Sequence, residues 1–267
     1  MILGDMGRLL VKVRSRILPP VQKHQRFPLS FSREDCSSCM KNRQWLWFFS
    51  LLFTSLLIVT SCSNPVDAVK NLQAGVGQQV IVLGDSIAAG YGVTEAEAFP
   101  KVLSQQLGLP ILNRGVSGDT TAAALTRLKT DVIAAEPWLV IVELGGNDFL
   151  QKIPQTETEQ NLRQIITSTQ ETGAIVVLLG ISLGLIEDDY KQLYQRVAKE
   201  TQAYLIPQIT NGILDDRRYR QDDIIHPNQA GHELLATRIA KSLQPLLAKA
   251  KWPSALLQYR QISYSVT

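Results

Sequence analysis

The strongest constraint on the fold is a repeated alternation, from about residue 79 onward, between short apolar runs and segments with helical periodicity. Five such runs, at 80–83, 111–112, 139–144, 175–179 and 204–206, are apolar on both faces. Runs of this kind are typical of parallel strands buried on both sides, with helices as the crossovers between them. The sequence therefore predicts an α/β fold, a three-layer α/β/α sandwich around a five-stranded parallel sheet.

Several of the expected helices have recognisable ends. Thr156 and Glu159 have the spacing of a capping box, and Gly173 is placed to end the helix that would begin there. Asp119 could cap an earlier helix, and Asn228 is expected to cap the last one. The inner face of that last helix would include Leu235, Ile239 and Leu243. The predicted domain spans 78–248, and the tail at 249–267 has no assignment.

The charge distribution argues against a nucleic-acid partner. Residues 1–61 contain nine Lys and Arg against three Asp and Glu, whereas residues 62–267 contain eighteen against twenty-one. The positive charge thus lies ahead of the predicted domain, which is itself slightly acidic. We expect no nucleic-acid binding from such a domain.

An uncharged segment at 45–59 follows Lys41 and Arg43. It is short for a membrane span and suits the apolar core of a signal peptide. It leads into Val59-Thr60-Ser61-Cys62, which resembles the bacterial lipobox, in which cleavage leaves a cysteine that carries lipid. A transmembrane helix extended to about residue 61 is the alternative.

We therefore expect a lipoprotein signal peptide at 40–61, lipid attached to Cys62 and a tether over 62–77. The protein would be exported and anchored by lipid to the bacterial cell envelope. Residues 1–39 precede Met40, which would be an ordinary signal start, so we expect this stretch to be a disordered or non-native leader. The lone CxxC of Cys36 and Cys39 within it is interpreted as incidental.

Polar residues follow the apolar runs at the end of a parallel sheet where ligands bind. The first such junction is Gly84-Asp85-Ser86, in which Ser86 would begin a helix with its backbone N–H free. The second contains Gly118 and the third is Gly145-Gly146-Asn147-Asp148, in which an amide side chain could donate to an oxyanion. Each segment alone is also compatible with an ordinary turn or helix cap.

The fourth junction, Asp223-Ile224-Ile225-His226, lies just before the last helix. One turn can bring the Asp223 carboxylate to one ring nitrogen of His226 while the other nitrogen faces a substrate. Asp222 is the rival carboxylate, and His232, which falls inside the helix, is expected to be structural. The domain offers too few His and Cys ligands for a metal site, so none is expected.

Taken together, the four junctions resemble the SGNH hydrolase family, also called the GDSL esterases and lipases. The matching blocks are Gly84-Asp85-Ser86, Gly118, Gly145-Gly146-Asn147-Asp148 and Asp223-x-x-His226, in the family's order over about 79–247. The spacing in this family favours Asp223 over Asp222. The residues in these blocks are most similar to those of the secreted thioesterase, arylesterase and lysophospholipase branch.

The resemblance implies a serine hydrolase that cleaves carboxylic esters or thioesters without a cofactor. Ser86, Asp223 and His226 would form the catalytic triad, and Ser86, Gly118 and Asn147 the oxyanion hole. A small acyl ester or lysophospholipid is the expected substrate, with acyl contacts in the loops after Leu150 and at 182–189. The alternatives are an acetyl esterase acting on cell-envelope glycans and a non-catalytic lipoprotein that binds acyl ligands.

Overall fold

The computed structural model describes residues 65–182 and 187–260, and the side chains of 187–189 are not described. The expectations for the leader, the signal peptide, Cys62 and the apolar residues at 183–186 therefore lie outside the described residues. Within the described ranges, no helix is both long enough and apolar enough to cross a membrane.

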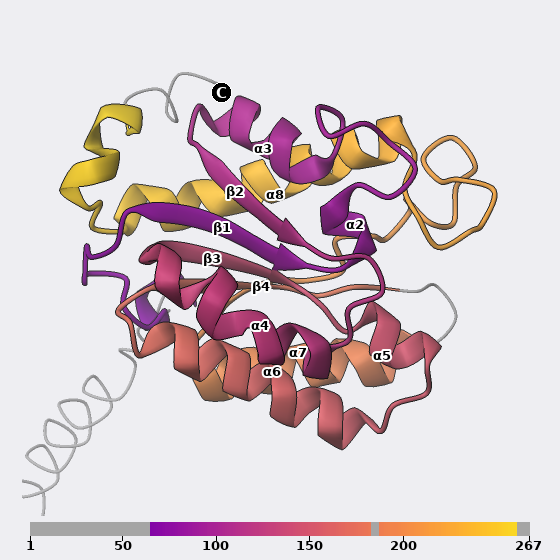
Figure 1. Ribbon diagram of the computed structural model, residues 1–267, viewed down its shortest axis with the longest axis horizontal. Coiled ribbons are helices and arrows are strands. Elements are labelled where there is room, and N and C mark those ends of the chain that lie inside the picture. The colour runs from indigo at the N-terminus through magenta and orange to yellow at the C-terminus, as the bar shows by residue number, and fades with distance from the viewer. Residues whose placement is uncertain (1–64, 183–186, 261–267) are drawn as a thin grey trace, which may run out of the picture. The chain divides into compact units, whose positions relative to one another are not determined.

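The centre of the fold is a parallel sheet of five strands in the order β2-β1-β3-β4-β5 (Figure 1). The strands are β1 (Gln79–Gly84), β2 (Ile111–Gly115), β3 (Pro137–Glu143), β4 (Ile175–Leu179) and β5 (Tyr204–Ile206). Each of the five apolar runs falls on one strand, so the predicted α/β fold is confirmed. All seven residues of β3 are buried, because this strand is in the middle of the sheet with helices on both faces.

Two layers of helices cover the sheet (Figure 1). One face packs against α3 (Phe99–Leu107), α8 (Gln229–Lys249) and the 3₁₀ helices η1 (Pro65–Ala68) and η3 (Ser254–Tyr259). The other face packs against α4 (Thr121–Asp131), α6 (Gln155–Gln170) and α7 (Glu187–Thr201). The short helices α2 (Ser86–Ala89) and α5 (Gly146–Leu150) follow β1 and β3 at the carboxyl end of the sheet, and η2 (Ile133–Ala135) precedes β3.

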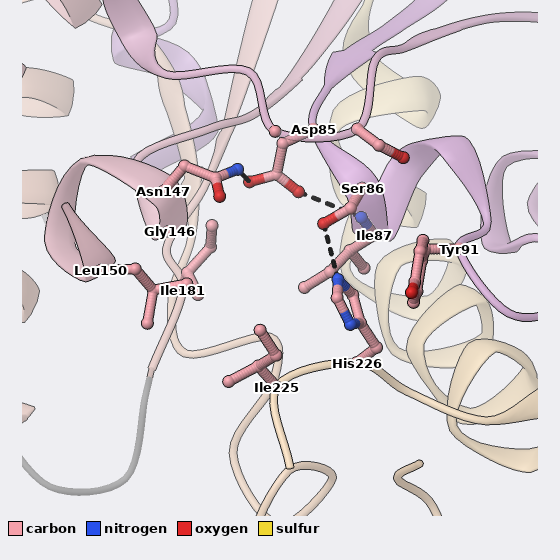
Figure 2. A pocket seen from close by; sticks show the side chains of 12 residues that line it. Asp85, Ser86, Ile87, Tyr91, Gly146, Asn147, Leu150, Ile181, Ile225 and His226 are labelled. Carbon is pink, nitrogen blue, oxygen red and sulfur yellow. Dashed lines mark hydrogen bonds between the residues drawn. The ribbon is translucent and has the colours of Figure 1, made fainter. Parts of the chain in front are cut away.

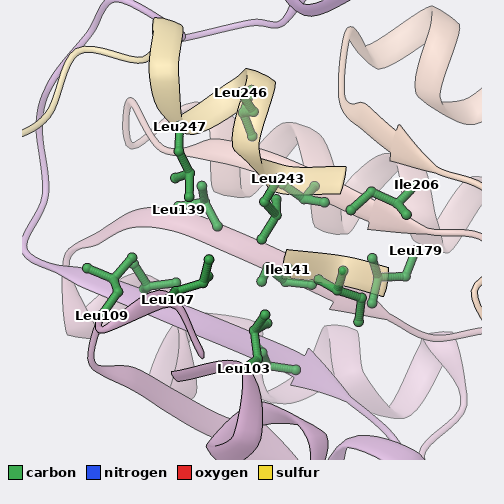
Figure 3. Packing of buried hydrophobic residues seen from close by; sticks show 14 of the residues in the cluster. Leu103, Leu107, Leu109, Leu139, Ile141, Leu179, Ile206, Leu243, Leu246 and Leu247 are labelled. Carbon is green, nitrogen blue, oxygen red and sulfur yellow. The ribbon is translucent and has the colours of Figure 1, made fainter. Parts of the chain in front are cut away.

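Alternate residues of each strand contribute to alternate faces. Leu139 and Ile141 of β3 pack with α3 and α8 (Figure 3), whereas Val140 and Val142 pack with the helices of the opposite face. These side chains are fully or almost fully buried, and burial of one such aliphatic side chain contributes about 1.5–3 kcal/mol. The sheet therefore forms a rigid support for the loops at its carboxyl end.

The segment expected to be a tether is part of the domain instead. Val66, Val69 and Leu72 are buried in the same cluster as α8. The carbonyl of Leu72 accepts the N–H of Lys251, so this segment and the chain that follows α8 are hydrogen-bonded to each other. The unassigned tail contributes as well, because Trp252 and Leu256 are buried. The described body of the domain thus extends beyond 78–248 at both ends.

Two expected helix caps are wrong. Helix α6 begins at Gln155 after Pro154, which makes no side-chain cap, and Glu159 is paired with Arg163 and Arg196 rather than with the helix start.

At α4, the side chain of Thr120 accepts the N–H of Ala123, whereas Asp119 forms an ion pair with Arg127. The cap at Asn228 is confirmed, because its side chain accepts the N–H of Gly231. Leu235, Ile239 and Leu243 lie on the buried face of α8 as expected.

Candidate active site

The predicted site residues meet at the carboxyl end of the sheet, where β1 has β2 on one side and β3 on the other. A cavity of about 350 Å³ opens there. Its lining includes Ser86, Asn147 and His226 (Figure 2). Gly118 lines it as well, so all four junctions contribute. The parallel arrangement explains this convergence, since successive strands deliver their following loops to one edge.

Ser86 is the first residue of α2, so it lies in the turn that connects β1 to this helix. Its Oγ is 2.8 Å from Nε2 of His226 (Figure 2). The other ring nitrogen, Nδ1, is 2.6 Å from Oδ2 of Asp223. Serine, imidazole and carboxylate are therefore connected in series by two hydrogen bonds.

The loop before α8 fixes this carboxylate. Oδ1 of Asp223 accepts the N–H groups of Ile225 and His226 at 3.1 and 3.0 Å, which leaves Oδ2 for the imidazole. Although partial burial raises the pKa of Asp223, hydrogen bonds from His226 and Ile225 outweigh it and lower the pKa below its ordinary value. Asp222 forms no hydrogen bond or ion pair with any residue in the described ranges. The loop geometry thus selects Asp223.

Tyr91 contacts the imidazole from another direction, and Ile224 strains the loop. The ring of Tyr91 lies 4.4 Å from the ring of His226, centroid to centroid, and restricts its rotation. Ile224 has a φ of 65°, a left-handed conformation that is costly for a β-branched residue. Ile224 is nevertheless 59% exposed, so packing does not compensate for this strain.

Three of the residues that line the cavity, Ser86, Gly118 and Asn147, carry N–H donors. The backbone N–H groups of Ser86 and Gly118 donate to no acceptor in the described part of the chain. Gly118 has a φ of +86°, which favours glycine, and the space beside its Cα is empty. The side-chain amide of Asn147 donates to the carbonyl of Asp119 at 3.0 Å and to Oδ2 of Asp85 at 3.2 Å. The three donors named in the sequence analysis are thus brought together.

Asp85 is a buried carboxyl that the sequence analysis did not single out. Its Oδ1 accepts the N–H of Ile87 and so caps α2, while Oδ2 accepts the Asn147 amide. Burial, partly offset by the Ile87 hydrogen bond, raises the pKa of Asp85 to about 6. Asp85 therefore connects the serine turn with the amide donor.

Arg127 and Asp148 also support the site and were missed. Arg127 pairs with Asp119 at 2.7 Å and donates to the carbonyls of Gly84 and Arg114, so it joins the carboxyl ends of β1 and β2 to the loop after β2. The fully buried Asp148 accepts the N–H of Thr121 at 2.8 Å and the Thr121 hydroxyl at 2.5 Å.

The contacts of Asp148 fix α5, and with it the neighbouring Asn147, against the start of α4. Sequence alone gives no sign that the Asp148 side chain is buried.

His232 lies outside the cavity lining. It is fully buried in α8, and its Nδ1 accepts the N–H of Phe99 at 3.3 Å. Burial lowers its pKa to about 4, so the ring is neutral near pH 7. These contacts support the structural role that was expected for it.

The remaining cavity lining is largely apolar. Ile87, Leu150, Ile181 and Ile225 surround the space in front of Ser86 (Figure 2). The expected contact region after Leu150 therefore begins at the cavity itself, whereas 183–186 lies outside the described residues. In the described ranges, no group of three or more His, Cys, Asp or Glu residues could hold a metal ion.

A Ser–His–Asp series beside the backbone N–H groups of Ser86 and Gly118, at the carboxyl end of a parallel sheet, is the arrangement of the serine hydrolases. The comparisons with known proteins agree with this class. Residues 82–234 match the model of the GDSL-like lipase/acylhydrolase family. The chain therefore belongs to this family, and it is an ester hydrolase.

Several relatives are similar along most of their own length. Thioesterase 1/protease 1/lysophospholipase L1 of Escherichia coli is 32% identical over 77% of this chain and 96% of that protein. Esterase TesA of Pseudomonas aeruginosa is 31% identical over 66% of this chain and 92% of that protein. A crystal structure of TesA superposes with a TM-score of 0.61 at 31% identity, covering 63% of this chain and 99% of the other.

Proposed function

We propose that this protein hydrolyses carboxylic esters or thioesters through a covalent intermediate on Ser86. The observation that carries the proposal is the series of two hydrogen bonds from Ser86 through His226 to Asp223 at an apolar cavity. A serine hydroxyl becomes an effective nucleophile only beside a base that can take its proton. This series supplies the base and the group that orients it.

In the first half-reaction, Nε2 of His226 accepts the Ser86 proton as Oγ attacks the acyl carbonyl. Asp223 keeps the proton of the neutral imidazole on Nδ1 and stabilises the imidazolium as it forms. His226 then donates its proton to the leaving alkoxide or thiolate, which departs with the acyl group left on Ser86. In the second half-reaction, water attacks this acyl group with His226 again as base, and the acid is released.

The negative charge that develops on the carbonyl oxygen needs donors placed in advance. The N–H groups of Ser86 and Gly118 and the Asn147 amide form such an oxyanion hole in this proposal. Removal of one donor of this kind typically slows turnover about 10²- to 10³-fold. No metal or organic cofactor is required by this chemistry.

For the substrate, we propose acyl esters or thioesters of lipid-like acids, including lysophospholipids. The apolar lining at Leu150, Ile181 and Ile225 suits an acyl chain. The Escherichia coli relative is named as a thioesterase and lysophospholipase, which favours the same substrate class.

The experiment assays the purified protein against p-nitrophenyl esters from acetate to palmitate, with Ser86→Ala in parallel. We expect the wild-type protein to hydrolyse these esters and Ser86→Ala not to. We also expect a fluorophosphonate probe to label Ser86 in the wild type. A preference for acetate that excludes longer chains would favour the glycan acetyl esterase. If the folded protein shows neither hydrolysis nor labelling, the result would favour the non-catalytic acyl-binding lipoprotein.

We further propose that Cys62 carries lipid and anchors the exported protein to the cell envelope. The support is the sequence Val59-Thr60-Ser61-Cys62 after an uncharged run. Metabolic labelling with an alkyne fatty acid should mark the wild-type chain and leave Cys62→Ala unmarked. Equal labelling of both chains would refute the anchor at this position.

A further inference from the structure

A second carboxyl group, Glu143, lies beneath the serine turn and has no part in the mechanism above. It is the last residue of β3, and its side chain is fully buried. Burial of a carboxyl group costs free energy unless hydrogen bonds compensate. The position therefore calls for an explanation in terms of what Glu143 contacts.

One oxygen of Glu143 is bound to the turn that carries the nucleophile. Oε2 accepts the N–H of Asp85 at 3.3 Å and the N–H of Ala88 at 3.2 Å. These residues stand one position before and two positions after Ser86. The approach is close, because a Cβ on Gly84 would lie 2.7 Å from Oε2. Glu143 therefore ties the first turn of α2 to the central strand of the sheet.

The other oxygen, Oε1, is buried and has no hydrogen-bond partner among the residues that the structure describes. Burial, and next the nearby charge of Asp85, raise the pKa of Glu143 well above its ordinary value. Burial raises the pKa of Asp85 as well, so both carboxyl groups of the pair hold a proton more readily than exposed ones do. The Asp85 carboxylate is the group that accepts the Asn147 amide.

We propose that Glu143 is a positioning residue for the reaction, which fixes the Ser86 backbone N–H and Oγ through Asp85 and Ala88. The proposal rests on the function proposed for Ser86. Glu143 does not line the cavity, and it acts only through the turn that it holds. Its useful feature is an oxygen at the right reach rather than a negative charge.

The test compares three substitutions that separate reach from charge. Glu143→Gln keeps an acceptor oxygen at the same reach without an ionisable group, so kcat should stay within about threefold of the wild type. Glu143→Asp keeps the acid but withdraws its oxygens by one methylene, so kcat should fall about tenfold. Glu143→Leu removes the acceptor, and kcat should fall about 10- to 100-fold, since small displacements of a reacting group have effects of this size. KM should change less than twofold in all three, because the cavity lining is untouched.

A matched control separates positioning from loss of stability. Glu159→Leu removes another buried glutamate, which lies on α6 outside the cavity lining and is paired with Arg163 of α6 and Arg196 of α7. This variant should unfold more easily but keep the wild-type kcat in its folded fraction. A parallel fall in kcat for Glu159→Leu would show that destabilisation alone explains the Glu143 series.

The ordering of the variants decides the proposal. A higher kcat and faster fluorophosphonate labelling at Ser86 in Glu143→Gln than in Glu143→Asp support the proposal, even if Glu143→Leu fails to fold. Higher values in Glu143→Asp, or equal values in the two variants, overturn it. Labelling is independent of the substrate panel, so a narrow natural substrate does not hide the result. If the wild type and Ser86→Ala behave alike in both assays, the proposed function itself is refuted, independently of the Glu143 series.

Discussion

Replacement of Asn147 separates the two properties that the oxyanion hole requires, a donor and the absence of negative charge. In the resting site the Asn147 amide donates to Asp85 and to the Asp119 carbonyl. Asn147→Ala removes the donor, and we expect kcat to fall about 10²- to 10³-fold. KM should change little, because the donor acts on charge that develops only in the transition state.

The Asn147→Asp variant is nearly the same size but should be the slower of the two. Its carboxylate would lie where the amide nitrogen is now, 3.2 Å from Oδ2 of Asp85, and beside the developing oxyanion. Two carboxyl groups at this separation cannot both ionise without a large rise in one pKa. Activity of Asn147→Asp should therefore decline further as the pH is raised from about 6 to 8, whereas Asn147→Ala should not show this additional decline.

Steady-state hydrolysis of p-nitrophenyl butyrate across this pH range measures both variants. Circular dichroism melting checks that each one folds, since two acceptors lose a donor in the alanine variant at a cost of about 1 kcal/mol each. An aspartate variant that equals or exceeds the alanine variant would refute the role given to charge. A loss below tenfold in Asn147→Ala would refute its role as an oxyanion donor.

Three further predictions test the loop before α8 and the tail. Asp223→Asn should lower kcat about 10²- to 10⁴-fold, because an amide nitrogen facing Nδ1 favours the wrong tautomer of His226, whereas Asp222→Asn should stay near the wild type; similar losses would contradict the assignment of Asp223. Ile224→Gly should leave the free energy of unfolding unchanged or raise it by up to about 1 kcal/mol, since relief of left-handed strain exceeds the entropy cost of glycine; a clear decrease in urea titration would exclude strain at this residue. Trp252→Ala should lower the free energy of unfolding by about 3 kcal/mol through loss of buried contacts while kcat stays unchanged; a change below about 1 kcal/mol would show that the tail does not support the domain.

The sheet could be predicted from the sequence because four of its strands are apolar enough to stand out. The exception in detail is β2, of which only Ile111 and Leu112 were recognised. Its later residues include Asn113 and Arg114, and the strand lies at the edge of the sheet with a mostly half-buried pattern. An edge strand has no neighbouring strand on one side, so its side chains are less buried and its sequence signal is weaker.

The residues at the cavity were predictable because they follow strands whose carboxyl ends must meet. The supporting carboxyl groups were not, since Asp85 and Asp148 occupy the same kind of polar junction as ordinary turns, and Glu143 falls within the apolar run 139–144. Only tertiary packing shows what these carboxyl groups contact. Whether a polar residue faces water or the core depends on neighbours distant in the sequence.

The supposed tether carried a signal that could have been used. Val66, Val69 and Leu72 recur at intervals of three residues, which is a helical period, and all three are buried. Composition alone suggested a linker, since the segment also contains Gly75 and Gly77. Periodicity was the better indicator here.

Both described ends of the domain lie at the amino end of the sheet, opposite the cavity (Figure 1). The Leu72 carbonyl accepts the N–H of Lys251, and the Lys251 carbonyl accepts the indole N–H of Trp138 at the start of β3. A solid support, fluorescent tag or partner enzyme joined ahead of Pro65 or behind Arg260 would therefore leave the cavity open to solution. This polarity suits the fold to immobilised catalysis and to display on a particle or cell surface.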